Sequence, residues 1–161
     1  MRHALFALIG VVLLALFPAM TYAQETHLTH VSVVERGRAD GPAVILIPGL
    51  STPRVVWDQL VPEIERDHRV ILVQINGFAT GDAAGANADP GALDGIVEDI
   101  AGYIRDQHVE RPAIIGHSMG GLTALMIAQR HPAAVDRIMI VDSLPFIGTL
   151  FVPGSTVETF R

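Results

Sequence analysis

The chain has 161 residues, of which 50% are hydrophobic, and a formal net charge of −6, so it is long enough for one globular domain and too apolar for a disordered chain. It contains no cysteine, and all 11 basic residues are arginine, which excludes disulfides, cysteine metal sites and the chemistry of a reactive thiol or lysine. An acidic chain without basic clusters also argues against nucleic acid as a partner. We expect neither a cofactor nor a metal ion.

Residues 1–23 have the pattern of a secretory signal peptide. Arg2 supplies the positive start, residues 4–17 form the apolar core, and Thr21-Tyr22-Ala23 forms a plausible cleavage site before Gln24. The apolar stretch is shorter than the roughly 20 residues that span a bilayer. We therefore expect a secreted or periplasmic protein. The alternative is an uncleaved membrane anchor, and only in that case do we expect contact with a membrane.

Three segments in the first half of the chain predict strands. Residues 28–36 predict an early strand, which is followed by turn-forming residues at 37–42. Residues 44–47 and 70–75 are largely apolar runs of the kind found in strands that are covered on both faces.

The segments that follow these strands predict a helix and one long loop. Thr52 is expected to cap a helix that begins at Pro53, with a kink or a restart at Pro62. Residues 76–91 form a loop rich in glycine and other small residues. A loop of this length in a compact domain is either functional or merely flexible, and the sequence favours neither alternative.

The second half of the chain alternates between helices and strands. An amphipathic helix is predicted by apolar residues at helical spacing, namely Leu93, Ile96, Val97, Ile100 and Ile104. A short apolar strand over 113–115, a helix that stops at 130–132 and a buried strand over 138–141 follow. This order predicts an α/β fold, with a parallel sheet, right-handed crossovers and helices on both faces.

The six residues Gly116-His117-Ser118-Met119-Gly120-Gly121 join an apolar strand to a helix. This is the context of a G-x-S-x-G nucleophile elbow, in which a strained turn presents a serine hydroxyl at the carboxyl end of a strand. Gly116 and Gly120 stand where a Cβ atom would clash with that turn. The helix that begins here adds free N–H groups and a positive dipole end, which favour an oxyanion. The alternative is a glycine-rich turn with a bystander serine.

With this elbow, the chain resembles the α/β-hydrolase superfamily, of the lipase and esterase type, over nearly all of residues 28–161. Pro48-Gly49-Leu50 stands where the family has its oxyanion loop, with proline in place of the common histidine. Trp57 stands where a helix tryptophan often follows, and Arg130-His131-Pro132 matches the usual end of the nucleophile helix.

The resemblance implies a role for each matched residue. Ser118 is the implied nucleophile, and the backbone N–H groups of Leu50 and Met119 are the implied oxyanion hole. Asp142 ends the strand after the nucleophile helix, where some members of the family place the acid of the triad and most do not. The alternative for Asp142 is a strand-end residue that caps the following turn.

The resemblance also implies that the sequence covers only the N-terminal part of the family fold, truncated after the sixth family strand. The family sheet has two further strands, and its catalytic histidine lies beyond the last of them. We therefore expect residues 24–161 to be a partial domain in which 143–161 begin a cap segment. We expect a truncated chain of this kind to self-associate, because residues 138–141 would become an outer strand with no neighbour on one side.

None of the histidines after the signal segment is expected to act as the base. His68, His108 and His131 each follow a helix and precede a strand, which places them at the edge of the sheet opposite the elbow. The turn is expected to direct His117 away from the serine hydroxyl, and His27 and His30 lie near the first strand.

The resemblance implies a serine hydrolase that acts on a small-molecule ester, thioester or amide through an acyl-serine. One alternative is a catalytically inactive, truncated member that binds a ligand or a partner chain. An acyltransferase or a haloperoxidase-like member is a third reading, because this fold hosts several chemistries. The sequence does not distinguish esterase, lipase, lactonase and peptidase.

Overall fold

The computed structural model describes residues 25–78, 84–144 and 152–156. The expected signal segment, residues 1–23, lies outside the described residues, as does most of the expected start of a cap at 143–161. Among the described residues, no helix combines the length and the apolar character that crossing a membrane requires.

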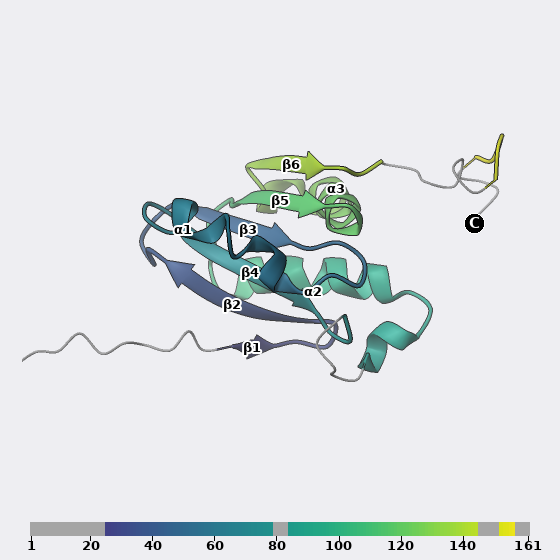
Figure 1. The fold of residues 1–161 in the computed structure, drawn as a ribbon, viewed down its shortest axis with the longest axis horizontal. Helices are drawn as coiled ribbons and strands as arrows, with labels where there is room; N and C mark the ends of the chain where they lie inside the picture. Colours follow the sequence, from purple (N-terminus) through teal and green to yellow (C-terminus); the bar gives the residue numbers. More distant parts are fainter. Residues whose placement is uncertain (1–24, 79–83, 145–151, 157–161) are drawn as a thin grey trace, which may run out of the picture.

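Six strands, three α-helices and three short 3-10 helices form the described part of the chain (Figure 1). The strands are β1 (Thr26–His27), β2 (Val31–Gly37), β3 (Ala43–Ile47), β4 (Arg69–Ile75), β5 (Ala113–His117) and β6 (Arg137–Val141). The α-helices are α1 (Val61–Ile64), α2 (Ala92–Asp106) and α3 (Met119–Arg130). The 3-10 helices are η1 (Arg54–Trp57), η2 (Gly85–Ala88) and η3 (Pro132–Ala134).

The strands form one mixed sheet in the order β1-β2-β4-β3-β5-β6. The strands β3, β4, β5 and β6 are parallel, as expected, whereas β1 and β2 run antiparallel to their neighbours. The expectation of an α/β sheet is therefore confirmed, but the sheet is not wholly parallel. The turn at residues 38–42 joins β2 to β3 and is too short for the crossover of about a dozen residues or more that parallel strands need. The turn therefore reverses the chain, and β2 runs antiparallel to its neighbour β4, which is parallel to β3.

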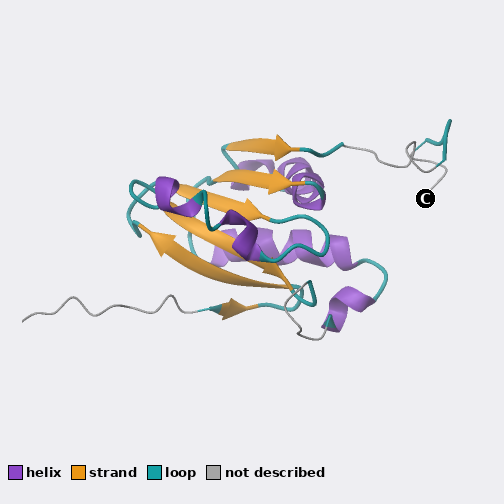
Figure 2. Cartoon of the chain, in the orientation of Figure 1, coloured by secondary structure: helices purple, strands orange, loops and turns teal. Residues whose placement is uncertain are grey.

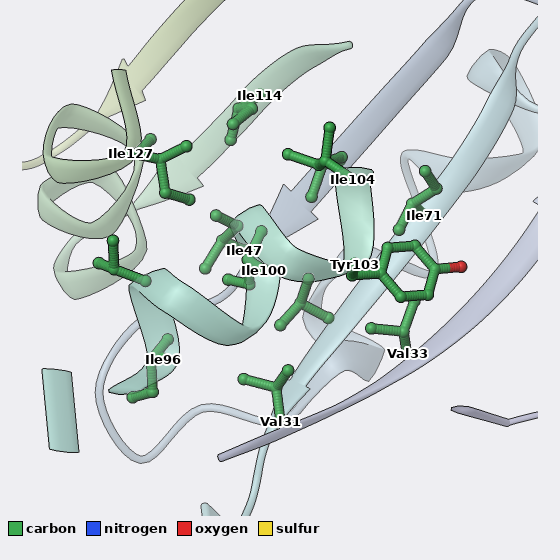
Figure 3. Packing of buried hydrophobic residues seen from close by; sticks show 14 of the residues in the cluster. Val31, Val33, Ile47, Ile71, Ile96, Ile100, Tyr103, Ile104, Ile114 and Ile127 are labelled. Atoms are coloured by element: carbon green, nitrogen blue, oxygen red, sulfur yellow. The ribbon is translucent and has the colours of Figure 1, made fainter. Parts of the chain in front are cut away.

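Helices cover both faces of the sheet, as the sequence predicts. In Figure 2, α2 and α3 pass behind the sheet, whereas η1 and α1 lie in front of it. The larger core packs α2 and α3 against the sheet, and Figure 3 shows Ile96, Ile100 and Ile104 of α2 directed toward the strands. The smaller core on the opposite face contains Trp57 and Val61. The expected amphipathic helix is confirmed as α2.

The helix expected from Pro53 onward is instead two short pieces, η1 and α1. Pro62 lies in the first turn of α1, so the expected restart occurs there; proline has no N–H to continue an earlier hydrogen-bond ladder. The expected cap at Thr52 is wrong. Its hydroxyl donates to the carbonyl oxygen of Leu50 at 3.1 Å, and η1 has no side-chain cap.

The strand β6 lies at the edge of the sheet, as expected for a truncated chain. It is not buried, although its apolar sequence taken by itself predicts a buried strand. Met139 is 58% exposed and Val141 is 38% exposed. The helix α3 packs beside β6 on one face, with Ile138 and Ile140 against the larger core. No described element pairs with the outer side of β6.

The segment around η2 is fastened to the rest of the domain through His30. The Nδ1 atom of His30 lies 2.7 Å from Oδ1 of Asn87 in η2, and its backbone N–H donates to Asp99 of α2 at 2.6 Å. Because the Asn87 amide donates to two backbone carbonyls, its Oδ1 is the acceptor and His30 Nδ1 is the donor. The ring rests on α2 at Gly95, where a Cβ atom would lie 2.1 Å from Nε2.

We expect Gly95→Ala to lower the free energy of unfolding by about 1–3 kcal/mol, because the new methyl group must displace the His30 ring from Asn87. Gly102→Ala in the same helix is the matched control, since its Cβ atom would meet only Arg105 Nη2 at 3.5 Å. That change should stabilise the helix by up to about 1 kcal/mol. Urea unfolding measures both, and an equal response at the two positions would contradict the packing described here.

We expect the 161-residue polypeptide to form oligomers at micromolar concentration, because residues 138–141 of the edge strand β6 carry no charge and can pair with another chain. Met139→Lys should shift the population toward monomer in light scattering, since a charged side chain on an edge strand opposes such pairing. Val56→Lys adds the same charge at an apolar residue in η1 that is 49% exposed. An equal shift in both variants would show that the edge is not the contact.

Candidate active site

Ser118 lies at the corner between the carboxyl end of β5 and the start of α3, and its backbone is strained. Its φ of 51° and ψ of −119° form a combination that residues with a side chain rarely adopt. Its N–H donates to the carbonyl oxygen of Val141 at 2.9 Å, and its own carbonyl accepts from Gly121 at 2.9 Å. These bonds hold the turn between β6 on one side and the first turn of α3 on the other.

Two glycines allow this corner to close. A Cβ atom on Gly116 would lie 2.2 Å from the carbonyl oxygen of Gly120, and one on Gly120 would lie 2.3 Å from the carbonyl oxygen of Ile47. Real Cβ atoms do not approach backbone oxygens so closely. The start of α3 therefore sits directly on the end of β3, as the elbow sequence predicts.

The loop after β3 lies against the same corner. A Cβ atom on Gly49 would lie 3.2 Å from Cβ of Ser118 and 3.0 Å from Nδ1 of His117, so this loop touches both residues of the turn. Among the described residues, no protein acceptor is recorded for the backbone N–H groups of Leu50 and Met119. Two N–H groups beside a serine are therefore left available to a ligand.

A polar network holds the far end of this loop in place. The backbone N–H of Arg54 donates to Oε1 of the buried Gln74 at 2.8 Å, and its guanidinium donates to Ser32 Oγ at 2.7 Å. Arg54 also pairs with Glu25. The Ser32 hydroxyl, which donates to Glu25 at 2.6 Å, and the Arg54 guanidinium lower the pKa of the Glu25 carboxyl below its usual range. The network thus anchors η1 to β2 and β4.

A cavity of about 730 Å³ opens beside Ser118. Its lining joins the loop after β3, the first turns of α2 and α3, and the segment after β6. The lining residues are Leu50, Leu93, Ser118, Met119, Leu122, Asp142, Ser143 and Leu144. A cavity of this size is within the range of small-molecule sites.

The cavity contains every residue to which the sequence assigns chemistry. Ser118, Leu50, Met119 and Asp142 all contribute to its lining, and the elbow glycines Gly116 and Gly120 lie beneath it. Asp142 is exposed and has a φ of 49°. Asparagine and aspartate tolerate this left-handed conformation better than most residues.

Sequence reasoning did not single out four lining positions for the site: Leu93, Leu122, Ser143 and Leu144. Leu93 and Leu122 belong to apolar helical patterns that predict only core packing. The first turns of their helices converge on one edge of the sheet, and no local signal in the sequence reports that convergence.

None of the histidines in the described part of the chain lines this cavity. Two of these histidines make contacts elsewhere. His131 Nε2 lies 3.1 Å from Oε2 of Glu98, and His68 Nδ1 lies 3.3 Å from the carbonyl oxygen of Ile64. The ring of His117 lies under Gly49, and its Nδ1 is buried without a protein partner. Within the described residues, no group of three or more acidic or histidine side chains is placed to hold a metal.

Comparison with known proteins relates this geometry to a family. A model of the alpha/beta hydrolase fold matches residues 42–160. RutD of Yersinia enterocolitica, provisionally named as a carbamate hydrolase, is 29% identical over 104 residues, which are 65% of this chain and 37% of that protein. The sn-1-specific diacylglycerol lipase ABHD11 of Mus musculus is 28% identical over 125 residues, which are 77% of this chain and 39% of that protein.

A solved structure gives the same fold. The crystal structure of a hydrolase from Pseudomonas aeruginosa PA01 superposes with a TM-score of 0.69 at 20% identity, covering 80% of this chain and 49% of that one. The chain therefore spans less than half the length of these relatives.

We expect Ser118→Gly to be more stable than Ser118→Ala by about 1 kcal/mol, because glycine relieves a strain of about 1–3 kcal/mol and loses part of that gain to backbone entropy. Ser143 does not have a positive φ, so the same pair of variants there should show alanine as the more stable. Urea unfolding of the four variants tests this. A Ser118→Ala variant as stable as Ser118→Gly would show that the turn is not strained.

Proposed function

This chain belongs to the α/β-hydrolase fold family, and from that premise we propose that it is a serine hydrolase with Ser118 as its nucleophile. The observation that carries the proposal is the corner at Ser118. There, a strained backbone holds a serine at the carboxyl end of β5, beside two N–H groups without a described protein acceptor, in one cavity. Strained backbone conformations of this kind cluster at active sites.

The proposed reaction begins with attack of Ser118 Oγ on the carbonyl carbon of the substrate. The new C–O bond converts the carbonyl to a tetrahedral intermediate, whose negative oxygen accepts hydrogen bonds from the N–H groups of Leu50 and Met119. The bond to the alcohol, thiol or amine then breaks, and a base passes the proton of the serine to that leaving group. Water repeats the sequence on the acyl-serine and releases the acid.

The base of this reaction is not among the residues that line the described cavity. A serine hydroxyl near neutral pH is a weak nucleophile without a base. By analogy with the family, we place the base on a histidine that is not among these 161 residues. Asp142 is our candidate for the acid that orients it, because this residue shares the cavity with Ser118.

The hydrolase names of the relatives support small molecules as substrates. We propose an ester, thioester or amide, since each presents a carbonyl carbon with a leaving group. The pattern at residues 1–23 supports export from the cytoplasm, with cleavage before Gln24 or retention as an anchor.

A second candidate function is a binding protein without turnover. The observation in its favour is that no histidine lies in the described lining of the cavity. The two candidates differ in the state of Ser118, because a fluorophosphonate reacts only with an activated serine.

We expect the fluorophosphonate to label Ser118 in a protein that includes the proposed histidine base. Ser118→Ala should abolish this labelling and lower the kcat of ester hydrolysis by several orders of magnitude. Ser143→Ala is the control, because Ser143 lies in the same cavity without the strained turn. It should retain labelling. Mass spectrometry locates the label, and an unlabelled but folded protein would favour the binding function.

A further inference from the structure

The cavity beside Ser118 has an unusual balance of side chains. Its described lining contains five apolar side chains, two serines and one carboxylate, that of Asp142, and no arginine or histidine. The arginines that lie near the lining in sequence are engaged elsewhere. Arg54 pairs with Glu25, Arg130 pairs with Asp94 and Glu98, and Arg137 pairs with Asp136. No cation in the described lining can compensate a negative charge on a bound molecule.

The apolar side chains surround Ser118 from several directions. Leu93 and Leu122 come from the first turns of α2 and α3 and are half-buried, whereas Leu50 and Leu144 are 63% and 49% exposed. Exposed leucines at the mouth of a cavity lose contact with water when an apolar ligand enters, which favours binding at about 25 cal/mol per Å² of buried apolar surface. The volume of about 730 Å³ accommodates a chain of several carbons.

We infer that this cavity selects an uncharged, apolar acyl group and rejects acyl groups that carry a carboxylate, with Asp142 as the residue that determines the rejection. The inference rests on the proposed function, because it names the substrate class of the same site. Asp142 acts through charge. No cationic side chain of the described lining would pair with a second carboxylate beside Asp142, so both desolvation and like-charge repulsion oppose its binding.

Methyl octanoate and monomethyl octanedioate test this inference, because they share the ester and the chain and differ in a terminal carboxylate. Binding is measured by equilibrium dialysis on the full chain carrying Ser118→Ala, so that neither ester is hydrolysed and no base is needed. We expect methyl octanoate to bind at least about tenfold more tightly than the anionic ester.

Asp142→Asn separates charge from apolar burial. Asparagine tolerates the positive φ of this position. The substitution removes one negative charge, which should narrow the ratio of the affinities for the two esters by about three- to tenfold. Glu110→Gln removes the same charge at an exposed residue outside this cavity and should leave the ratio unchanged. Raising the salt concentration should also narrow the ratio, since exposed charges are screened.

Three results would overturn the inference: equal binding of the two esters, tighter binding of the anionic ester, or binding of neither. An unchanged ratio in Asp142→Asn would remove the assigned role of Asp142. These outcomes are independent of turnover. A protein that binds methyl octanoate selectively but is never labelled at Ser118 would refute the proposed hydrolase and retain the inferred selectivity.

Discussion

The close approach of the start of α3 to the end of β3 is the constraint on which the site depends. It is a contact between backbones, since a Cβ atom on Gly120 would lie 2.3 Å from the carbonyl oxygen of Ile47. Because β3 is followed at once by Gly49 and Leu50, the same contact brings the loop after β3 against Ser118. Close packing of the main chain therefore places Ser118 beside the N–H groups of Leu50 and Met119, in a protein interior that is packed as densely as a crystal.

The strain at Ser118 is maintained by interactions on each side of the turn. Its N–H and carbonyl are both hydrogen-bonded, to Val141 and to the first turn of α3, so relaxing the backbone would break these bonds. The loop that faces it is anchored at Arg54 by Gln74 and Ser32. A preorganised turn and a preorganised loop are what stabilisation of a developing oxyanion requires, because donors that are already in place need no reorganisation during the reaction.

The two edges of the sheet differ in how they are finished. On one side β2 carries the short strand β1, and His30 beside it is bound to η2 and α2. On the other side β6 presents exposed apolar residues, Met139 and Val141, within the described part of the chain. The cavity lies near the β6 side, at Asp142 and Leu144. Association at this edge and access to the cavity are therefore expected to influence each other.

The sequence by itself determined the elements whose signals are local: the elbow at 116–121, the parallel strands and the amphipathic helix α2. Glycine spacing and apolar periodicity are properties of neighbouring residues, and the glycine spacing also singled out Ser118. Leu50 and Met119 were assigned through the resemblance to a family, and Ser118, Leu50 and Met119 line the same cavity. Only the tertiary structure decided the antiparallel β2, the division of the helix after Pro53 and the lining by Leu93 and Leu122. Each of these depends on contacts between segments distant in sequence, which a local pattern does not encode.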